Sequence, residues 1–345
     1  MKLSDFDYIL PKELIAQYPL KERDKARLLV LDREKSTIEQ CLFKNIIGYF
    51  QPGDLLVLNN TKVLPSRLIG SRKTGGKVEI LLLRQKSGLT FEALIRPGRV
   101  KLKEKIIFNG STSLTINPER SRRINGGKVY GEVTARNEIT FSACDAQAIY
   151  NLGVMPLPPY IKRDPEDLDG VYYQTVYARE PGSIASPTAG LHFSKGLIAK
   201  IKSLGVNIDY ITMHIGYSTF RPVKTEDITE HKMEKEYFRI SKEAQGNINQ
   251  ARLEKGRIFA VGTTGCRTLE AYASGSKQGY TDLFIYPGYK FKMVDCLLTN
   301  FHLPRTTLFM LACAFAGEKL MRKAYQEAIA RKYRFYSYGD AMLII

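Results

Sequence analysis

Three of the four histidines lie in loops rich in glycine, threonine and proline, where the residue types could carry proton transfer and ligand binding. The loops are SPTAGLHF (residues 186–193), MHIGYSTFRP (213–222) and TNFHLP (299–304). An imidazole titrates near neutral pH, and hydroxyl and amide groups fix the orientation of a ligand. A fourth loop, GTTGCRT (262–268), adds threonines and an arginine. The four loops together indicate one composite small-molecule site.

Buried strands are expected immediately before three groups of these polar residues. Residues 206–215 would deliver His214, 258–261 would deliver Thr263, Thr264 and Arg267, and 283–286 would deliver Tyr286, Gly288 and Tyr289. Because the carboxyl ends of parallel strands share one edge of a sheet, we expect these loops to face one crevice. The loop with His192 precedes a helix capped by Ser194, whose N-terminus favours an anion.

The pattern of expected strands and helices changes twice along the chain, which predicts an α/β fold with an inserted all-β domain. Residues 1–60 and 151–345 alternate strand and helix patterns, as a mixed, largely parallel sheet requires. Residues 61–150 consist of short β-branched runs between glycine, asparagine and proline turns, which indicates a small β-barrel. We therefore predict a discontinuous catalytic domain and a barrel inserted into it. Further expected elements are helices at 11–17 and 267–274 and strands at 113–116 and from 335 onward.

The net charge of +17 is concentrated in the predicted barrel. Residues 61–150 hold 17 Lys and Arg against 7 Asp and Glu, while residues 1–60 hold 9 of each. Clustered cations of this kind favour a polyanionic partner such as RNA. No apolar run approaches the roughly 18 residues of a membrane span, and no leader pattern opens the chain, so we expect a cytoplasmic protein.

Several common sites are not indicated. GSRKTGGKV (70–78) lacks the Gly-Lys-Ser/Thr end of a phosphate-binding loop, and there is no dinucleotide-binding, H-E-x-x-H or G-x-S-x-G motif. The five cysteines form no C-x-x-C pair, so neither a zinc site nor a disulfide framework is expected. Cys266 is notable only because it lies in GTTGCRT.

Long stretches of the chain resemble the S-adenosylmethionine:tRNA ribosyltransferase-isomerase family of queuosine biosynthesis. The matching blocks are PTAGLHF, YSTFRPV, AVGTTGCRTLEA, TDLFIYPGYKFKMVDCLLTNFHLP, RFYSYGDAMLI, GDLLVLNNTKVLPSRLIG and GVMPLPPYIKR, and the resemblance runs from residue 3 to 345. Ser186 stands where the family usually has Ala, Ser218 where it has Gly, and Asn60 where it has Asp. Ser218 adds a Cβ where a glycine could adopt positive φ, and Asn60 removes a carboxylate.

The resemblance implies a β-barrel inserted into an α/β domain and a specific reaction. The ribosyl part of S-adenosylmethionine is transferred to 7-aminomethyl-7-deazaguanine at the wobble position of a tRNA and isomerised, giving epoxyqueuosine with release of adenine and methionine. S-adenosylmethionine is then a co-substrate, and neither a metal nor a prosthetic group is implied. We expect a monomer.

The chemistry implied by the resemblance assigns roles to the candidate residues. A proton must leave the carbon beside the sulfonium, so a base is needed. His214 and His192 are expected to transfer protons and His302 to have an orienting role, and the sequence does not decide which histidine is the base. His231 is the weakest candidate. Tyr286, Tyr289 and Phe291 could face the sulfonium. Arg267 or the 188–195 turn could hold the methionine carboxylate. The full set expected at the substrate is Thr188, Gly190, Gly216, Thr219, Phe220, Arg221, Thr263, Thr264, Arg267, Tyr286, Gly288, Tyr289, Asn300 and Phe301.

The basic turns of the predicted barrel are expected to hold the tRNA backbone. The residues concerned are Arg96, Arg99, Lys101, Lys103, Arg122 and Arg123, with Lys105 and Arg120 beside them. Two other functions also fit part of the sequence. A non-catalytic RNA-binding module explains the charge but not the histidine loops, and an S-adenosylmethionine-dependent RNA methyltransferase would need a glycine-rich loop after the first strand, where RLLVLDREK (27–35) has none.

Overall fold

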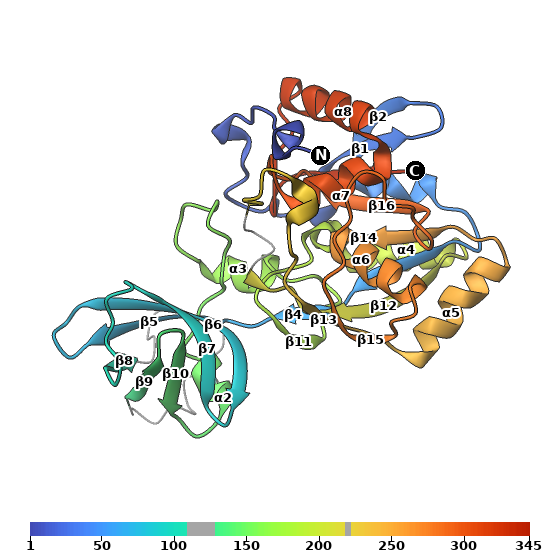
Figure 1. Ribbon diagram of the computed structural model, residues 1–345. Coiled ribbons are helices and arrows are strands. Elements are labelled where there is room, and N and C mark those ends of the chain that lie inside the picture. Colours follow the sequence, from blue (N-terminus) through green and yellow to red (C-terminus); the bar gives the residue numbers. More distant parts are fainter. Residues whose placement is uncertain (109–127, 218–221) are drawn as a thin grey trace. The chain divides into compact units, whose positions relative to one another are not determined.

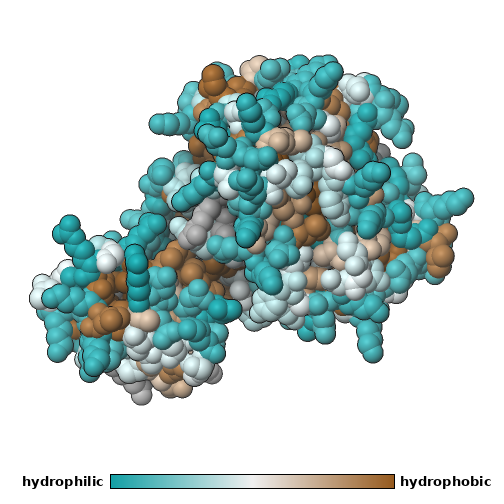
Figure 2. All heavy atoms as spheres, viewed as in Figure 1, coloured by the Kyte–Doolittle hydropathy of each residue, from teal (hydrophilic) through white to brown (hydrophobic). Residues whose placement is uncertain are grey.

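The computed structural model describes residues 1–108, 128–217 and 222–345, which form two compact units (Figure 1). The first unit comprises Met1–Lys62, Pro159–Lys162 and Gln174–Ile345, and the second comprises Val63–Pro158 and Arg163–Tyr173. No helix of these described residues is both long and apolar enough to cross a membrane. On the face shown in Figure 2, hydrophilic side chains cover most of the surface of each unit.

The first unit is built on a mixed nine-stranded sheet with the order β15-β13-β12-β3-β14-β16-β17-β1-β2. Its centre, β12-β3-β14-β16, is parallel, whereas β17 runs antiparallel to β16 and parallel to β1. The strands are β1 (Arg27–Asp32), β2 (Thr37–Leu42), β3 (Leu55–Asn59), β12 (Asn207–Met213), β13 (Glu236–Ile240), β14 (Ile258–Val261), β15 (Gln278–Thr281), β16 (Cys296–Asn300) and β17 (Ala341–Ile344). A separate two-stranded sheet joins β4 (Thr61–Val63) and β11 (Glu180–Ser183).

Helices cover both faces of this sheet, because alternate residues of the central strands are apolar on opposite sides (Figure 1). One face packs against α5 (Lys242–Leu253), α6 (Gly262–Ala273), α7 (Thr307–Ala316) and α8 (Glu318–Ala330). The other packs against α4 (Lys195–Ser203) and the 3-10 segment η4 (Phe43–Tyr49). The remaining 3-10 segments are η1 (Leu3–Phe6), η2 (Lys12–Leu14), η3 (Arg23–Lys25), η5 (Thr188–His192) and η7 (Ile228–Glu230).

The second unit is a closed antiparallel barrel with the strand order β10-β7-β6-β5-β8-β9. Its strands are β5 (Arg67–Arg72), β6 (Lys77–Ser87), β7 (Thr90–Arg96), β8 (Lys105–Phe108), β9 (Val129–Ala135) and β10 (Glu138–Ser142), and α2 (Ala146–Tyr150) and α3 (Asp167–Tyr172) accompany them. A Cβ on Gly70 would lie 2.6 Å from Ile106 and 2.7 Å from Phe108, so only glycine fits there. The predicted fold class, an α/β fold with an inserted β-barrel, is confirmed.

Several predicted elements differ from the structure. Residues 283–286 form no strand; the central strand of this region is β16, at Cys296–Asn300. All five β16 residues are buried, whereas 283–286 are mostly half-buried and pack outside the sheet. Helix α6 begins at Gly262 rather than near 267, only η2 forms within 11–17, and the last strand begins at Ala341. The strand expected at 113–116 lies outside the described residues.

Candidate active site

Polar residues converge at one edge of the nine-stranded sheet. The carboxyl ends of β12, β14 and β16 lie at this edge because the strands between them are parallel. The amino end of β17 lies there too, because β17 runs antiparallel to β16. Ligand sites of α/β folds form at such edges, just beyond the ends of the strands.

A pocket of about 680 Å³, including its open mouth, lies at this edge. Half of the eighteen lining residues carry a hydroxyl group. The lining comprises Tyr160, Ser186, Pro187, Thr188, Ala189, Ile215, Gly262, Thr263, Thr264, Thr299, Asn300, Phe301, His302, Leu303, Thr306, Leu308, Tyr336 and Ser337.

Asn300, the last residue of β16, organises one wall of the pocket. Its Oδ1 accepts a hydrogen bond from Thr188 Oγ1 at 3.0 Å. Its Nδ2 lies 3.1 Å from His192 Nε2 and faces the carbonyls of Tyr336 at 3.2 Å and Asp340 at 3.3 Å. Three acceptors therefore surround the amide nitrogen, which fixes the orientation of the Asn300 side chain.

His192 supports this wall from behind. It is buried against Phe43, with a ring-centroid separation of 5.0 Å, and does not line the pocket. Burial, with the nearby charges of Arg334 and Arg23, lowers the pKa of His192 to about 3. The imidazole is therefore neutral at pH 7, and its contact with the pocket passes through Asn300.

His302 lies in the pocket wall itself. Its Nε2 is 2.7 Å from Thr299 Oγ1, and its backbone N–H donates to the Tyr325 hydroxyl at 2.9 Å. The Tyr8 hydroxyl donates to its carbonyl oxygen. Burial lowers the pKa of His302 to about 3, so this side chain also brings no charge at pH 7.

His214 follows β12 and lies in a different environment. Its Nδ1 is 2.8 Å from Thr61 Oγ1, and its ring stacks on Tyr237 with centroids 5.6 Å apart. A Cβ on Gly182, whose φ is +147°, would lie 2.7 Å from His214 Nε2, so glycine leaves room for the ring. Partial burial lowers the pKa of His214. His214 is half-buried and is not among the pocket-lining residues, although its neighbour Ile215 is.

The fourth histidine, His231, also lies away from the pocket. Its ring packs edge-on against Phe284 at 5.3 Å, and burial lowers its pKa.

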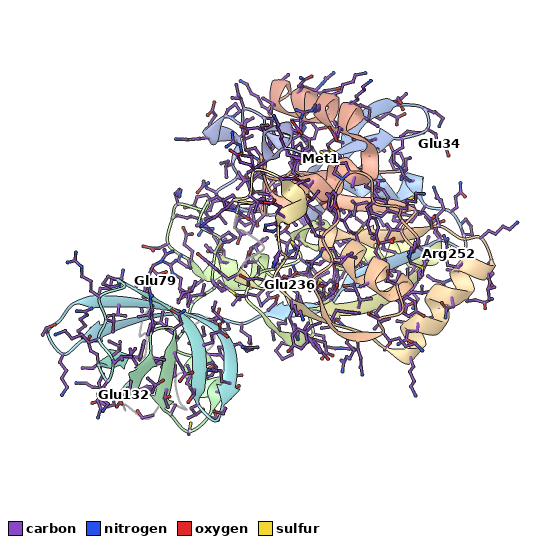
Figure 3. All side chains as sticks on the ribbon, viewed as in Figure 1. Met1, Glu34, Glu79, Glu132, Glu236 and Arg252 are labelled. Carbon is purple, nitrogen blue, oxygen red and sulfur yellow. The ribbon has the colours of Figure 1, made fainter. Side chains whose placement is uncertain are left out.

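Arg267 is committed to a buried ion pair. Its Nη1 donates to a carboxylate oxygen of Glu236, and its Nε donates to the carbonyl of Leu283 at 2.9 Å. The other Glu236 oxygen accepts from the N–H of Gly216 at 3.0 Å. Figure 3 labels Glu236 within the α/β unit. The pair thus ties the loop after β12 to α6 and to the segment after β15.

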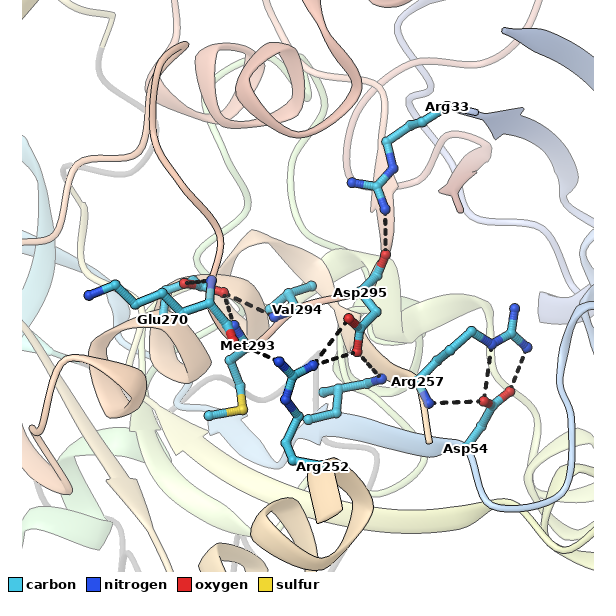
Figure 4. Close-up of polar contacts among 10 residues, drawn as sticks. Arg33, Asp54, Arg252, Arg257, Glu270, Met293, Val294 and Asp295 are labelled. Atoms are coloured by element: carbon cyan, nitrogen blue, oxygen red, sulfur yellow. Dashed lines mark hydrogen bonds and ion pairs between the residues drawn. The ribbon is translucent and has the colours of Figure 1, made fainter. Parts of the chain in front are cut away.

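The aromatic segment at 286–291 is held by Glu270. This buried carboxylate accepts from the hydroxyl of Tyr289 at 3.2 Å. It also accepts from the backbone N–H groups of Lys292, Met293 and Val294, the last two of which are labelled in Figure 4. Tyr289 packs edge-on against Phe291, with centroids 5.1 Å apart. The same figure shows Arg257 bonded to Asp54 and Arg252 bonded to Asp295. The contacts of Glu270 and Arg252 fix the loop that leads into β16.

The structure brings together only part of the set predicted from the sequence. Thr188, Thr263, Thr264, Asn300, Phe301 and His302 line the pocket. Gly190 lies behind it, where a Cβ would come within 2.1 Å of the Tyr177 hydroxyl. Gly216, Arg267, Tyr286, Gly288 and Tyr289 do not line it, and Thr219, Phe220, Arg221, Arg122 and Arg123 lie outside the described residues.

Several pocket residues were not predicted from the sequence. Tyr336 and Ser337 enter from the amino end of β17, and Tyr160 packs on Tyr336 with ring centroids 4.3 Å apart. Ser186, Thr299 and Thr306 are the other hydroxyl-bearing lining residues that were not predicted. Ser186 directly precedes the block PTAGLHF, Thr299 and Thr306 lie in or just after TNFHLP, and Tyr336 and Ser337 lie in RFYSYGDAMLI. Asn60, one of the departures, is buried and accepts from Thr212 Oγ1 at 2.8 Å.

The barrel carries a basic groove of its own. Arg72, Lys73, Lys103 and Lys105 line it with Thr74 and Glu104. Arg72 Nε lies 3.4 Å from Glu104, and Arg72 Nη2 is buried without a hydrogen-bond partner among the described residues. Of the predicted tRNA-binding residues, Lys103 lines this groove, while Arg96, Arg99 and Lys101 are exposed on the same unit.

Away from this groove, some of the barrel's charged side chains form ion pairs. Arg84 contacts Glu92 at 3.0 Å, and Lys86 contacts Glu138 at 2.6 Å. Figure 3 labels two other acidic residues of the barrel, Glu79 and Glu132.

The cysteines and acidic side chains that the structure describes form no further site. Burial raises the pKa of the Cys266 thiol well above its usual range, so Cys266 is a packed thiol and not a thiolate. Cys296 and Cys313 are also buried. Within the part of the chain that the structure describes, no three His, Cys, Asp or Glu side chains come together as a metal site would need.

The fold and the pocket define an α/β enzyme unit with a polar small-molecule site, joined to a basic β-barrel. The family model described as queuosine biosynthesis protein matches residues 3–344, and the chain belongs to this family. It is 50% identical to an S-adenosylmethionine:tRNA ribosyltransferase-isomerase of Sulfurihydrogenibium sp. (strain YO3AOP1) and 47% identical to that of Carboxydothermus hydrogenoformans, each over 100% of both chains. The resemblance noted in the sequence is confirmed, and the chain is a ribosyltransferase-isomerase.

A solved structure agrees with this assignment. The crystal structure of S-adenosylmethionine tRNA ribosyltransferase from Thermotoga maritima is 36% identical in sequence and covers 99% of this chain and 100% of its own, with a TM-score of 0.56.

Proposed function

We propose that this enzyme transfers the ribosyl part of S-adenosylmethionine to 7-aminomethyl-7-deazaguanine at the wobble position of a tRNA and isomerises it. The product is epoxyqueuosine-tRNA, and adenine and methionine are released. S-adenosylmethionine acts as a co-substrate. The observation that carries the proposal is the hydroxyl-lined pocket at the carboxyl edge of the sheet, in a chain that matches the queuosine family from end to end.

His214 is the histidine best suited to remove the proton beside the sulfonium. It is half-buried, whereas His192 and His302 are buried with pKa values near 3, too low for an effective base at neutral pH. The Thr61 hydroxyl, 2.8 Å from Nδ1, orients the imidazole. His192 as a second proton-transfer group stays a prediction; its contact with Asn300 supports a positioning role.

Two other predicted contacts with S-adenosylmethionine stay predictions. Tyr286 and Tyr289 would face the sulfonium, and Arg267 would bind the methionine carboxylate. The ion pair of Arg267 with Glu236 would have to share the guanidinium with that carboxylate. Arg267 Nη2, which is buried and has no partner among the described residues, is the nitrogen available for it.

The barrel is proposed to hold the tRNA through its phosphate backbone. The groove at Arg72, Lys73, Lys103 and Lys105 gathers four cations around one carboxylate. Cations at this density bind phosphates and release counterions, which gives affinity without sequence preference. Arg96, Arg99 and Lys101 would extend the contact along the same unit.

The direct test is incubation with S-adenosylmethionine and a tRNA that carries 7-aminomethyl-7-deazaguanine, followed by chromatography of the small molecules. Free adenine and methionine that depend on the modified base are the expected products. S-adenosylhomocysteine instead would indicate a methyltransferase, and tight tRNA binding with neither product would indicate a binding module. An unmodified tRNA of the same sequence is the matched control.

A further inference from the structure

The described lining of the active-site pocket contains no Arg, Lys, Asp or Glu. Its one imidazole, His302, is neutral at pH 7 because burial lowers its pKa to about 3. S-adenosylmethionine has two chemically different ends: a methionine part with a carboxylate, an ammonium and a sulfonium, and a neutral adenine. An ionic group buried without a countercharge loses its hydration without compensation, so this lining favours a neutral group.

Two residues that line the pocket each carry a buried hydroxyl group that has no partner among the described residues. The two hydroxyl groups are Ser186 Oγ and Tyr336 Oη. Other pocket hydroxyls are already bonded within the chain, such as Thr188 to Asn300 and Thr306 to the carbonyl of Leu303. A buried hydroxyl without a partner is unfavourable, so the two groups are poised to bond to a ligand. Each can donate and accept, as the ring nitrogens and exocyclic amine of a purine require.

Two aromatic rings, those of Tyr160 and Tyr336, lie in the pocket wall beside Ser337. The rings of Tyr160 and Tyr336 lie 4.3 Å apart at an angle of 35°, and the Tyr160 hydroxyl is 2.6 Å from Ser337 Oγ. Burial and the neighbouring tyrosines raise the pKa of Tyr336, which keeps its hydroxyl protonated. Planar bases stack on aromatic rings of this kind.

We propose that this pocket is the subsite for the adenine of S-adenosylmethionine, with Ser186 and Tyr336 bonding to the edge of the base. The inference rests on the proposed function, because it assigns one part of that co-substrate to one part of the site. The methionine end lies outside this pocket. Ser186 and Tyr336 are thereby specificity-determining residues for the purine.

The first test measures binding of the separate parts to the full-length enzyme by titration calorimetry. Adenine and adenosine are expected to bind and to compete with S-adenosylmethionine, whereas methionine is expected not to bind at this pocket. Free 7-aminomethyl-7-deazaguanine serves as the second base. Binding of that base or of methionine, with none of adenine, would overturn the assignment.

The second test removes single hydroxyls. Ser186→Ala and Tyr336→Phe are each expected to weaken adenine binding about 3- to 10-fold, the effect of one hydrogen bond. The matched control is Thr268→Val, which removes a buried, unpartnered hydroxyl of α6 that does not line the pocket. All three variants are expected to keep or raise the melting temperature, but the control should leave adenine binding unchanged.

The results separate this inference from the proposed function. If Ser186→Ala and Tyr336→Phe melt at or above the wild-type temperature and bind adenine as the wild type does, the subsite assignment is wrong. That result leaves the proposed reaction standing, because adenine release by the wild type tests the reaction separately. If the wild type releases no adenine with the modified tRNA, the proposed reaction fails, whatever the binding measurements show.

Discussion

In the α/β unit, the candidate ligand pocket carries no charged side chain among the described residues, whereas the barrel groove gathers four cations around one carboxylate. The pocket wall is fixed by buried hydrogen bonds such as those of Asn300, and charges in this unit are paired deep inside, as Arg267 is with Glu236. The barrel's charges lie near water. On the proposed function, we therefore expect the pocket to recognise shape and hydrogen bonds and the barrel to recognise charge. The effects of substitution, pH and salt should therefore differ between the two units.

The largest expected effect is on catalysis in the α/β unit. His214→Gln should lower kcat by about 10²- to 10⁴-fold, because general-base catalysis contributes that range. Adenine binding should be unchanged, because His214 does not line the pocket. His231→Gln is the control, since His231 packs on Phe284 away from the pocket. Wild-type turnover by His214→Gln in the adenine-release assay would remove this residue from the mechanism.

A comparable effect on stability should come from the buried ion pair. Arg267→Met leaves the Glu236 carboxylate buried without its partner, which should cost about 3–5 kcal/mol of the free energy of unfolding. In the barrel, Arg84→Met removes the exposed pair with Glu92 and should cost at most about 1 kcal/mol. Urea unfolding of both variants measures the contrast. Equal losses would mean that the two units do not differ in how they use charge.

Acid should destabilise the α/β unit, which holds all four histidines. His192 and His302 have folded-state pKa values near 3, below the ordinary value of about 6.5. The contribution of each neutral imidazole to the free energy of unfolding is fully present above about pH 6.5. It is lost as the pH falls toward 3, by up to about 1.4 kcal/mol per pH unit for each histidine. For the two histidines together, we expect the free energy of unfolding to fall by about 2–4 kcal/mol between pH 7 and pH 5.

The buried thiols of Cys266, Cys296 and Cys313 can report this loss. Their labelling should occur at lower urea concentration at pH 5 than at pH 7, and His302→Gln should reduce the shift. A labelling midpoint that does not depend on pH would show that the two imidazoles are not held neutral.

The smallest expected effect is on tRNA binding by the barrel and on how that binding depends on salt concentration. Neutralising Lys73, Lys103 and Lys105 together to Gln should weaken tRNA binding and reduce the slope of log Kd against log salt by up to about 3, roughly one for each phosphate contact. The control neutralises Arg84, Lys86 and Lys128, which are exposed on the same unit but do not line the groove. Equal slopes for the two triple variants would place the tRNA elsewhere.

The sequence predicted the two-part fold because its signals are local. Short β-branched runs between turns mark the barrel, and the helix cap at Ser194 marks α4. The apolar run at 283–286 was taken as the strand because it precedes the Pro287–Gly288 turn. The actual strand, β16, ends in Thr299 and Asn300, whose polar side chains made it resemble a loop.

The site was only partly predictable for topological reasons. Thr263 and Thr264 were predicted because they follow a buried run at its carboxyl end, whereas Asn300 was predicted from the loop TNFHLP. Tyr336 and Ser337 were missed because they enter from the amino end of an antiparallel strand, which no local pattern reveals. The partnership of Arg267 with Glu236 joins residues on α6 and β13, so only the folded chain shows that this arginine is already paired.

The measurement that tests the account most directly is the rate of adenine release as a function of both substrates for two variants. Ser186→Ala should raise KM for S-adenosylmethionine and leave KM for tRNA unchanged. The triple substitution of Lys73, Lys103 and Lys105 to Gln should do the reverse, with kcat preserved at saturating tRNA. If both variants changed the same constant, the division between a neutral pocket for the co-substrate and a charged barrel for the tRNA would be contradicted.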